Sequence, residues 1–166
     1  MDDIRTRRAR TEDVRPIRAI VAPLVATRRL VAKDAVTYYE SLQQFRVAEL
    51  DGAVVGCGAL HVMWDDLAEV RTLAVAQDRL GSGVGHALLR DLVADARALG
   101  VRRIFVLTFE TAFFTRHGFV TIDGQAVPPE VYAELLRSYD EGVAEFLDLE
   151  RVKPNTLGNT RMVLTL

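Results

Sequence analysis

The sequence predicts an α/β fold in which a mixed, mostly antiparallel sheet is flanked by helices. Strand-like apolar segments alternate with amphipathic helical segments along the chain. The stretch from Leu67 to Gly100 contains a buried strand, a glycine-dense turn and a long amphipathic helix ended by Gly100. The apolar segment VRRIFVLT follows it and completes a β-turn-α-β unit. We therefore expect the strand over residues 70–75 to have this segment as its parallel neighbour.

Length and composition favour one ordinary globular domain over residues 1–166. The chain is 49% hydrophobic and 27% charged, and its net charge of −2 argues against a nucleic-acid partner. No apolar run approaches a membrane span, and the charged start MDDIRTRRARTEDV does not resemble a secretory signal. A cytoplasmic protein with no membrane partner is expected.

The cysteine and the histidines give little reason to expect a metal. Cys57 is the one cysteine, so it has no intrachain disulfide partner, and within VVGCGAL it is expected to be a core thiol. The three histidines, His61, His86 and His117, lie far apart without metal-ligand spacing. No metal is expected.

The N-terminal part predicts a strand and two helices. The segment ATRRLVAKD between the helices is a cationic loop that either lines a pocket or is simply solvated. The predictions are a strand over Arg5–Arg10, a helix from Glu12 to about Val21 with Thr11 as its N-cap and Pro23 at its end, and a helix over Val36–Gln44 with Val36, Tyr39 and Leu42 on one side.

The remaining elements are marked by turn residues. Residues 45–75 predict three antiparallel strands joined at Asp51-Gly52 and Asp65-Asp66. Further along, we expect a short helix ended by Gly118, a helix from about Pro129 that stops before Gly142, a polar KPNTLGN loop, and a last strand over Arg161–Leu166.

The glycine-dense turn has the character of an anion cradle. Gly81, Gly83 and Gly85 lack a Cβ, and the helix that begins there directs backbone N–H groups toward a ligand. No GK[ST] follows, which excludes a triphosphatase loop, and the GxGxG spacing fits a dinucleotide fold poorly. A phosphate site and a plain tight turn both stay open on the glycines alone.

Three segments together, LAEVRTLAV, GSGVGHALL and FFTRHGF, resemble the acetyl-CoA-binding core of the GNAT acetyltransferases. The resemblance implies acetyl-CoA as cosubstrate and a sheet whose fourth and fifth strands splay apart. Leu80 departs from the family's usual Arg or Gln, and Phe114 from its usual Tyr acid. The implied CoA contacts are Leu73, Ala74, Val75, Leu80, Gly81, Ser82, Gly83, Val84, Gly85, His86, Phe113 and Arg116.

Glu69 matches the glutamate that the family places on this strand as a base. A carboxylate near the thioester can take the proton of the attacking amine, directly or through water. The alternative is a solvated strand-edge acid paired with Arg71 or Arg46, and Glu110 is a second candidate base. A free thiol has a pKa of about 8.5, so the CoA thiolate can leave without a dedicated acid.

The segments RLVAKDAVTYYESLQQFRV, IFVLTFETAFFTRHGF and KPNTLGNTRM are similar to the acetyltransferase domain of bacterial N-acetylglutamate synthases. This implies acetyl transfer to L-glutamate, the first step of arginine biosynthesis, by a short form without the kinase-like domain of larger members. Another small amine such as glutamine, and a non-catalytic acyl-CoA sensor, stay open, as does a homodimer. The implied substrate contacts are Leu30, Lys33, Arg71, Thr72, Thr108, Lys153 and Arg161.

Overall fold

The computed structural model describes residues 3–166, which form two compact units. The first unit contains residues up to 61 together with 70–99, and the second contains residues 62–69 together with 100–166. The chain passes from one unit to the other within the strands β3, Ala53–Trp64, and β4, Leu67–Val75. A single domain over residues 1–166 stays a prediction.

The strands of the first unit pair antiparallel, as predicted for the two strands on either side of Asp51-Gly52. β1, Arg5–Arg8, pairs with β2, Phe45–Leu50, and β2 pairs with β3. The turn between β2 and β3 has positive φ at both Asp51 (52°) and Gly52 (79°), as a two-residue type I′ hairpin requires. The predicted hairpin at Asp51-Gly52 is confirmed.

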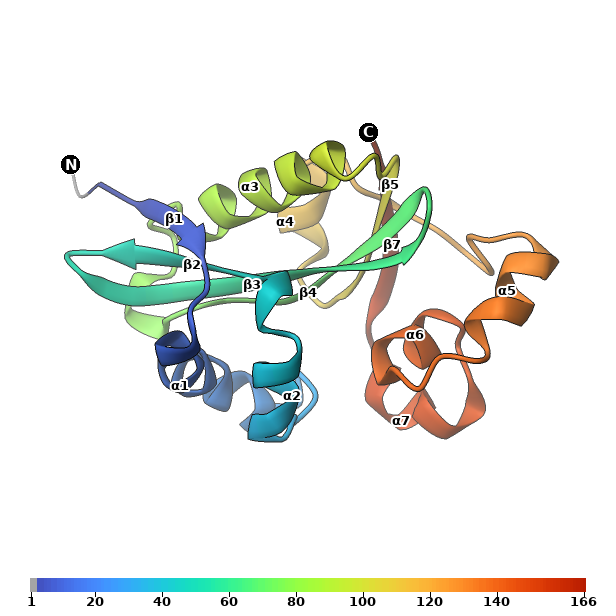
Figure 1. Ribbon diagram of the computed structural model, residues 1–166, viewed down its shortest axis with the longest axis horizontal. Helices are drawn as coiled ribbons and strands as arrows, with labels where there is room; N and C mark the ends of the chain where they lie inside the picture. Colours follow the sequence, from blue (N-terminus) through green and yellow to red (C-terminus); the bar gives the residue numbers. More distant parts are fainter. Residues whose placement is uncertain (1–2) are drawn as a thin grey trace. The chain divides into compact units, whose positions relative to one another are not determined.

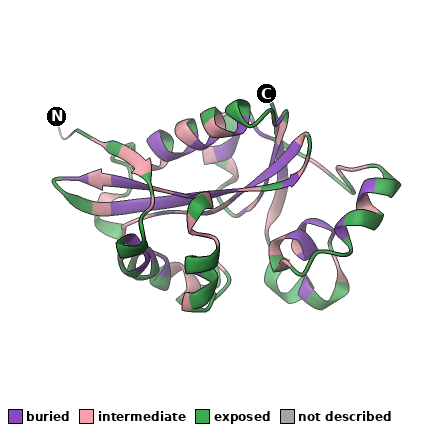
Figure 2. Ribbon diagram, viewed as in Figure 1, coloured by how far each residue is buried: buried purple, intermediate pink, exposed green. Residues whose placement is uncertain are grey.

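Helices cover both faces of the sheet in the first unit. Figure 1 shows α3, Val84–Ala98, on one side of β2 and β3, with α1, Val14–Ala26, and α2, Ala35–Glu40, on the other. Neighbouring residues of β2 therefore enter different clusters: Val47 packs with α1, and Ala48 packs with α3. Figure 2 shows the resulting burial of the central strands.

Two predictions about α1 are wrong. Pro23 lies inside the helix, which continues to Ala26; the proline has no N–H to donate to the Ala19 carbonyl, but it does not end the helix. The N-terminus is preceded by a 3-10 helix, Thr11–Asp13, and is held by Asp13, whose Oδ2 accepts the backbone N–H of Arg10 at 2.6 Å. Thr11 is not the N-cap.

The apolar side of α2 also differs from the prediction. Tyr38 is the buried residue, at 3% exposure, whereas Val36 and Tyr39 are 56% and 49% exposed. The ring of Tyr38 packs against Phe45, with 5.9 Å between the ring centroids. In place of the single helix predicted over Val36–Gln44, α2 ends at Glu40 and a 3-10 helix over Leu42–Gln44 follows. The α-helix of six residues is too short to define a repeating apolar face.

Two glycines of β3 set how closely α3 approaches the sheet. A Cβ on Gly56 would lie 2.6 Å from Val84 Cγ1 and 3.2 Å from the carbonyl oxygen of Ala74. A Cβ on Gly58 would lie 2.9 Å from Leu92 Cδ1. The absence of these two side chains lets the helix, and the glycine turn at its N-terminus, lie close to the strand.

The second unit is built on a parallel pair. Residues 67–69 of β4 pair in parallel with residues 103–105 of β5, Arg103–Thr108. β5 also pairs antiparallel with β7, Thr160–Thr165, which pairs with the short strand β6, Val120–Thr121. The parallel pair is confirmed, but its register is earlier in β4 than the predicted 70–75.

Four short helices belong to the second unit, and two of them, α5, Pro129–Leu135, and α6, Glu141–Phe146, pack onto its strands. The helix α4, Thr111–Arg116, ends before Gly118 as predicted. Two helices were not predicted, α6 and α7, and Gly142 lies within α6 instead of following a helix. The helix α7 covers Lys153–Thr156. Two further 3-10 helices cover Gln77–Arg79 in the first unit and Glu150–Val152 in the second.

The new helix α6 has a recognisable start. Asp140 Oδ1 accepts the backbone N–H of Val143 at 2.8 Å, which is an N-cap bond. The side chains of Val143 and Phe146 enter the same core as Phe105 of β5. None of the helices over residues 3–166 is long and apolar enough to cross a membrane.

Candidate active site

The glycine turn of the first unit has the backbone that an anion cradle needs. Gly81 and Gly83 have φ of 78° and 90°, a region that favours glycine, whereas Gly85 lies inside α3. The first intrahelical bond joins Ala87 N to the Gly83 carbonyl at 3.0 Å, so the N–H groups of Val84 and Gly85 precede the helical ladder. A Cβ on Gly81 would meet no heavy atom within 4 Å, so the turn is open on that side.

A cavity of about 380 Å³ adjoins the turn. It is lined by Ile4, Leu50 and residues 78–82, including the exposed Leu80. Arg79 also lines it, and its Nε lies 3.5 Å from Asp78 Oδ2. Arg79 was missed by the sequence reasoning, although it directly precedes the Leu80 position where a family cation was expected.

Thr72 of β4 has a strained backbone conformation. Its φ is 53°, which is rare for a β-branched residue, and its side chain is buried. Lys33 Nζ donates to Thr72 Oγ1 at 3.1 Å, and Cys57 Sγ donates to the Thr72 carbonyl oxygen at 3.4 Å. Two predicted substrate residues, Lys33 and Thr72, are therefore in direct contact. Strained backbone of this kind is often found at functional sites.

The other predicted groups of the first unit have simpler surroundings. Leu30 packs against the core of α1, and Arg71 is half-buried. Burial raises the pKa of the Cys57 thiol to about 12, so the thiol stays protonated at neutral pH. The prediction of a core thiol is confirmed.

Glu69 is a buried carboxylate in the second unit. It is 4% exposed and pairs with Phe105 at the last position of the β4–β5 parallel ladder. Glu69 is therefore not a solvated acid, whereas its pairing with Arg71 stays an open alternative. Its suggested partner Arg46 instead donates two bonds to Asp95, at 2.6 and 2.8 Å. A carboxylate withdrawn from water in this way needs a polar or charged neighbour.

Arg161 of β7 is a half-buried cation of the same unit. Its Nη2 donates to the Phe146 carbonyl at 2.7 Å and its Nη1 to the Glu145 carbonyl at 3.3 Å, at the C-terminal end of α6. Its guanidinium carbon lies 5.0 Å from the centroid of the Phe105 ring. Burial lowers the pKa of Arg161, whereas the charges of Asp148 and Glu69 act to raise it.

The remaining predicted residues of the second unit make local contacts. Thr108 Oγ1 accepts the backbone N–H of Glu110 at 2.8 Å, and Lys153 Nζ lies 3.4 Å from Glu150 Oε2. Phe113 is half-buried and Arg116 is exposed. Phe114, at the family's Tyr position, is buried against Phe119, with 5.1 Å between ring centroids. Phe114 is thus a packing residue. Over residues 3–166, no group of three or more His, Cys, Asp or Glu side chains could hold a metal ion.

The fold and the cradle define an acetyltransferase, and the comparison with known families agrees. Residues 22–119 match the model of the acetyltransferase (GNAT) family, and the chain belongs to this family. The predicted family and fold class, the acetyltransferase activity and acetyl-CoA as cosubstrate are thereby confirmed.

Two similar proteins are named amino-acid acetyltransferases. The chain is 56% identical over 163 residues to a Mycobacterium tuberculosis protein named amino-acid acetyltransferase, covering 96% of this chain and 93% of that one. It is 38% identical to the amino-acid acetyltransferase of Ralstonia nicotianae over 70% of this chain but only 27% of that protein.

Two solved structures are also similar to this chain. Rv2747 from Mycobacterium tuberculosis, crystallised with CoA and a second ligand, has a TM-score of 0.94 at 56% identity and covers 98% of this chain and 99% of its own. N-acetylglutamate synthase from Neisseria gonorrhoeae, complexed with coenzyme A and N-acetyl-glutamate, has a TM-score of 0.79 at 23% identity over 100% of this chain and 36% of that one. The second similarity concerns the fold alone.

Proposed function

We propose that this enzyme transfers the acetyl group of acetyl-CoA to the α-amine of L-glutamate, with Glu69 as the base. The burial of Glu69 at the end of the parallel ladder carries the proposal, because a buried carboxylate beside a reacting amine can take its proton. Support also comes from the relative named amino-acid acetyltransferase, at 56% identity over almost the whole chain.

Acetyl-CoA supplies the acetyl group and a thiolate leaving group. The chain's own contribution to binding is the open turn at Gly81 and Gly83, whose backbone amides would hold the pyrophosphate. Leu73, Ala74 and Val75 lie farther along the strand that carries Glu69, and their backbone N–H groups are proposed to polarise the thioester carbonyl. Phe113 and Arg116 are kept as proposed CoA contacts.

Recognition of a dicarboxylate requires cations on the protein. On the first unit, Lys33 contacts Thr72, where the backbone is strained, and a substrate carboxylate could replace the Thr72 hydroxyl as the partner of Lys33. On the second unit, Arg161 directs its hydrogen bonds to neutral carbonyl oxygens, so its positive charge persists next to the Glu69 region. Leu30, Arg71, Thr108 and Lys153 stay as weaker candidates.

The wider biological assignment follows from the glutamate substrate. N-acetylglutamate would make the enzyme an N-acetylglutamate synthase at the first step of arginine biosynthesis, in the cytoplasm. The partners are then small molecules, and a homodimer is compatible with this role. Glutamine and aspartate differ from glutamate by one group, so they are the substrates to test against it.

The first test is thiol release from acetyl-CoA across a panel of amino acids and amines. We expect glutamate to give the highest kcat/KM, with glutamine and aspartate below it. If glutamine or another amine is preferred, the glutamate assignment is wrong but the acetyltransferase assignment stands. If no amine exceeds background while CoA raises the Tm, the non-catalytic sensor is the better description.

The second test concerns the base. Glu69→Gln should lower kcat by about 10²–10⁴-fold, a typical contribution of general base catalysis, and leave CoA binding intact. Glu110→Gln is the matched control, since Glu110 was the other candidate carboxylate. If Glu110→Gln lowers kcat and Glu69→Gln does not, the base has been assigned to the wrong residue.

A further inference from the structure

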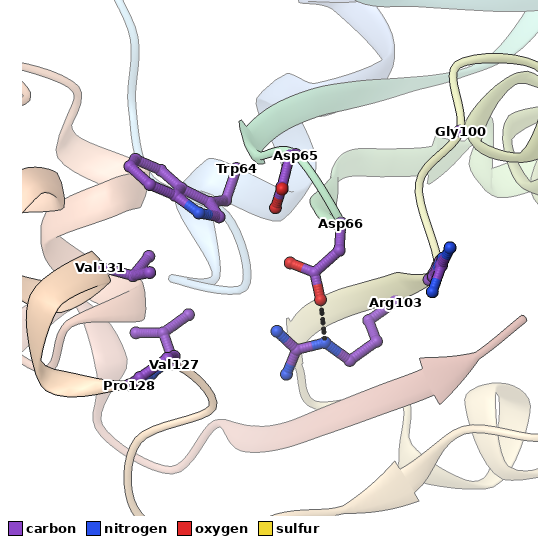
Figure 3. Close-up of a pocket in the computed structure, with 9 residues that line it drawn as sticks. Trp64, Asp65, Asp66, Gly100, Arg103, Val127, Pro128 and Val131 are labelled. Atoms are coloured by element: carbon purple, nitrogen blue, oxygen red, sulfur yellow. Dashed lines mark hydrogen bonds and ion pairs between the residues drawn. The ribbon is translucent and has the colours of Figure 1, made fainter.

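A second cavity lies within the second unit, apart from the groups assigned to acetyl transfer. Its volume is about 500 Å³, within the range of small-molecule sites. Three segments line it: the β3–β4 turn, the start of β5 and the start of α5 (Figure 3). The lining residues are Trp64, Asp65, Asp66, Gly100, Arg102, Arg103, Val127, Pro128 and Val131.

Arg103 connects these three segments through hydrogen bonds. Its Nε donates to Asp66 Oδ2 at 3.0 Å, and its Nη1 donates to the Ala126 carbonyl at 2.5 Å. The backbone N–H groups of Arg102 and Arg103 both donate to the Asp66 carbonyl, at 3.0 and 2.9 Å. Figure 3 shows the Asp66–Arg103 pair across the cavity from Val127 and Pro128. Hydrogen bonds within the protein therefore connect the three walls.

The charges that remain on the lining are of opposite sign. Asp66 and Arg103 neutralise each other, with 3.0 Å between Asp66 Oδ2 and Arg103 Nε. Asp65 and Arg102 are both exposed lining residues: Asp65 lies in the β3–β4 turn, and Arg102 directly precedes β5. A pure anion would meet Asp65 unfavourably and a pure cation would meet Arg102 unfavourably, so the lining suits a ligand that carries both charges.

The rest of the lining is apolar and aromatic. Trp64 packs partly against the core that contains Phe105, and Val131 belongs to the same core. Val127 and Pro128 complete this wall on the side of α5. In Figure 3 the Trp64 ring and the Val131 side chain lie on the same side of the cavity. An aliphatic or aromatic body would cover this surface and remove it from water.

We propose that this cavity is a second, non-catalytic binding site for a small zwitterion with an apolar body, such as a free apolar α-amino acid. The ammonium group would pair with Asp65, the carboxylate with Arg102, and the side chain would lie against Trp64, Val127 and Pro128. The site is distinct from the base, because Asp66 precedes Glu69 by three residues of β4, about 10 Å along an extended strand.

The test uses a reporter that the chain already contains. Trp64 is the single tryptophan of the sequence and lines the cavity, so ligand binding should change its fluorescence. The full chain, without acetyl-CoA, is titrated with L-leucine, with 3-methylbutylamine, which lacks the carboxylate, and with 4-methylpentanoate, which lacks the amine. L-leucine should give a saturable change and bind at least about tenfold more tightly than either analogue.

Variants then locate the binding. Asp65→Asn and Arg102→Gln should each weaken L-leucine binding by about tenfold or more, whereas the exposed controls Asp123→Asn and Arg97→Gln should leave it unchanged. All four variants should retain acetyl transfer, which shows that they are folded. Absence of a saturable signal, equal binding of the three ligands, or no effect of either cavity variant would overturn the proposal. Because this binding is measured without turnover, its failure is distinct from failure of the glutamate assignment.

Discussion

Arg7 and Arg161 both hold a helix in place, one in each unit, and they do so with different partners. Arg7 donates to Asp13 at 2.7 and 3.0 Å and to Glu49 at 2.8 Å, and these carboxylates raise its pKa. Arg161 donates to carbonyl oxygens at the end of α6, and burial lowers its pKa. The charge of Arg7 is neutralised by two carboxylates in direct contact, whereas Arg161 donates to carbonyl oxygens and has the charges of Asp148 and Glu69 near it. Arg7 is therefore structural, and for Arg161 a role toward the substrate is proposed in addition to its structural one.

The largest effect is expected from Arg161→Ala. The carbonyl groups of Glu145 and Phe146 lose a donor and the Phe105 ring loses its cation, so the free energy of unfolding should fall by about 2–4 kcal/mol. The KM for the amino-acid substrate should also rise. Urea unfolding and steady-state kinetics measure the two effects separately.

Arg161→Lys divides the two roles of this residue. A lysine keeps the positive charge but cannot donate to two carbonyls in the same fork. We expect it to recover part of the KM and little of the lost stability. If Arg161→Ala leaves KM unchanged, Arg161 has no part in substrate recognition and the contrast with Arg7 is only structural.

A smaller effect is expected from Asp13→Asn, which breaks the pair with Arg7. The bond from Arg7 lowers the pKa of Asp13 below its usual 3.8, so the stabilisation is complete above this pH and is lost as pH falls through the folded-state value. At pH 7 the variant should lose about 1.5–3 kcal/mol, as is typical of hydrogen bonds to charged groups. Its free energy of unfolding should also depend less steeply on pH below about 4.

Kinetics provide the control for Asp13→Asn. Since Asp13 and Arg7 are not proposed to contact either substrate, both KM values should match those of the unmodified chain. An acid dependence identical to that of the unmodified chain would mean that the Arg7–Asp13 pair contributes no net stability. A raised amino-acid KM would contradict the purely structural role of Arg7.

The third prediction concerns packing in the first unit. Gly56→Ala places a methyl group against Val84 and the Ala74 carbonyl, neither of which can turn away easily. Overpacking of this kind costs about 1–3 kcal/mol. Because Val84 begins α3, the KM for acetyl-CoA should rise as well. Thermal unfolding and CoA titration measure the two effects.

Gly58→Ala is the matched control for this substitution. Its Cβ would approach the ends of two flexible leucine side chains, Leu92 and Leu73, at 2.9 and 3.0 Å. We expect a smaller loss of stability than for Gly56→Ala and little change in CoA binding. Equal effects on CoA binding would mean that contact with Val84 does not position the cradle.

Turns and helix ends were predicted well from local sequence where the backbone conformation permits only a few residue types. Asp51-Gly52 predicted the first hairpin because both positions need positive φ, and Gly100 correctly marked the end of α3. Elements set by tertiary packing were predicted less well. Tyr38 is buried because Phe45 lies beside it, and no spacing within the short helix α2 signals that contact.

The site was predictable in part for the same reason. The turn at Gly81 and Gly83 was predicted because the backbone has positive φ at both positions, which favours glycine. The contact of Lys33 with Thr72 depends on a residue 39 positions away along the chain, which no local motif encodes. The N-cap Asp140 of α6 is a signal that could have been read, since Asp three residues before an apolar position often begins a helix.

The fit of α3 against Gly56 and Gly58 has a kinetic consequence for cofactor capture. Because the helix lies directly on the strand, we expect the turn at its N-terminus to keep its conformation when acetyl-CoA binds, so that little ordering entropy is lost. The observed rate of CoA association should then rise linearly with CoA concentration, without a plateau from a slow rearrangement of the turn.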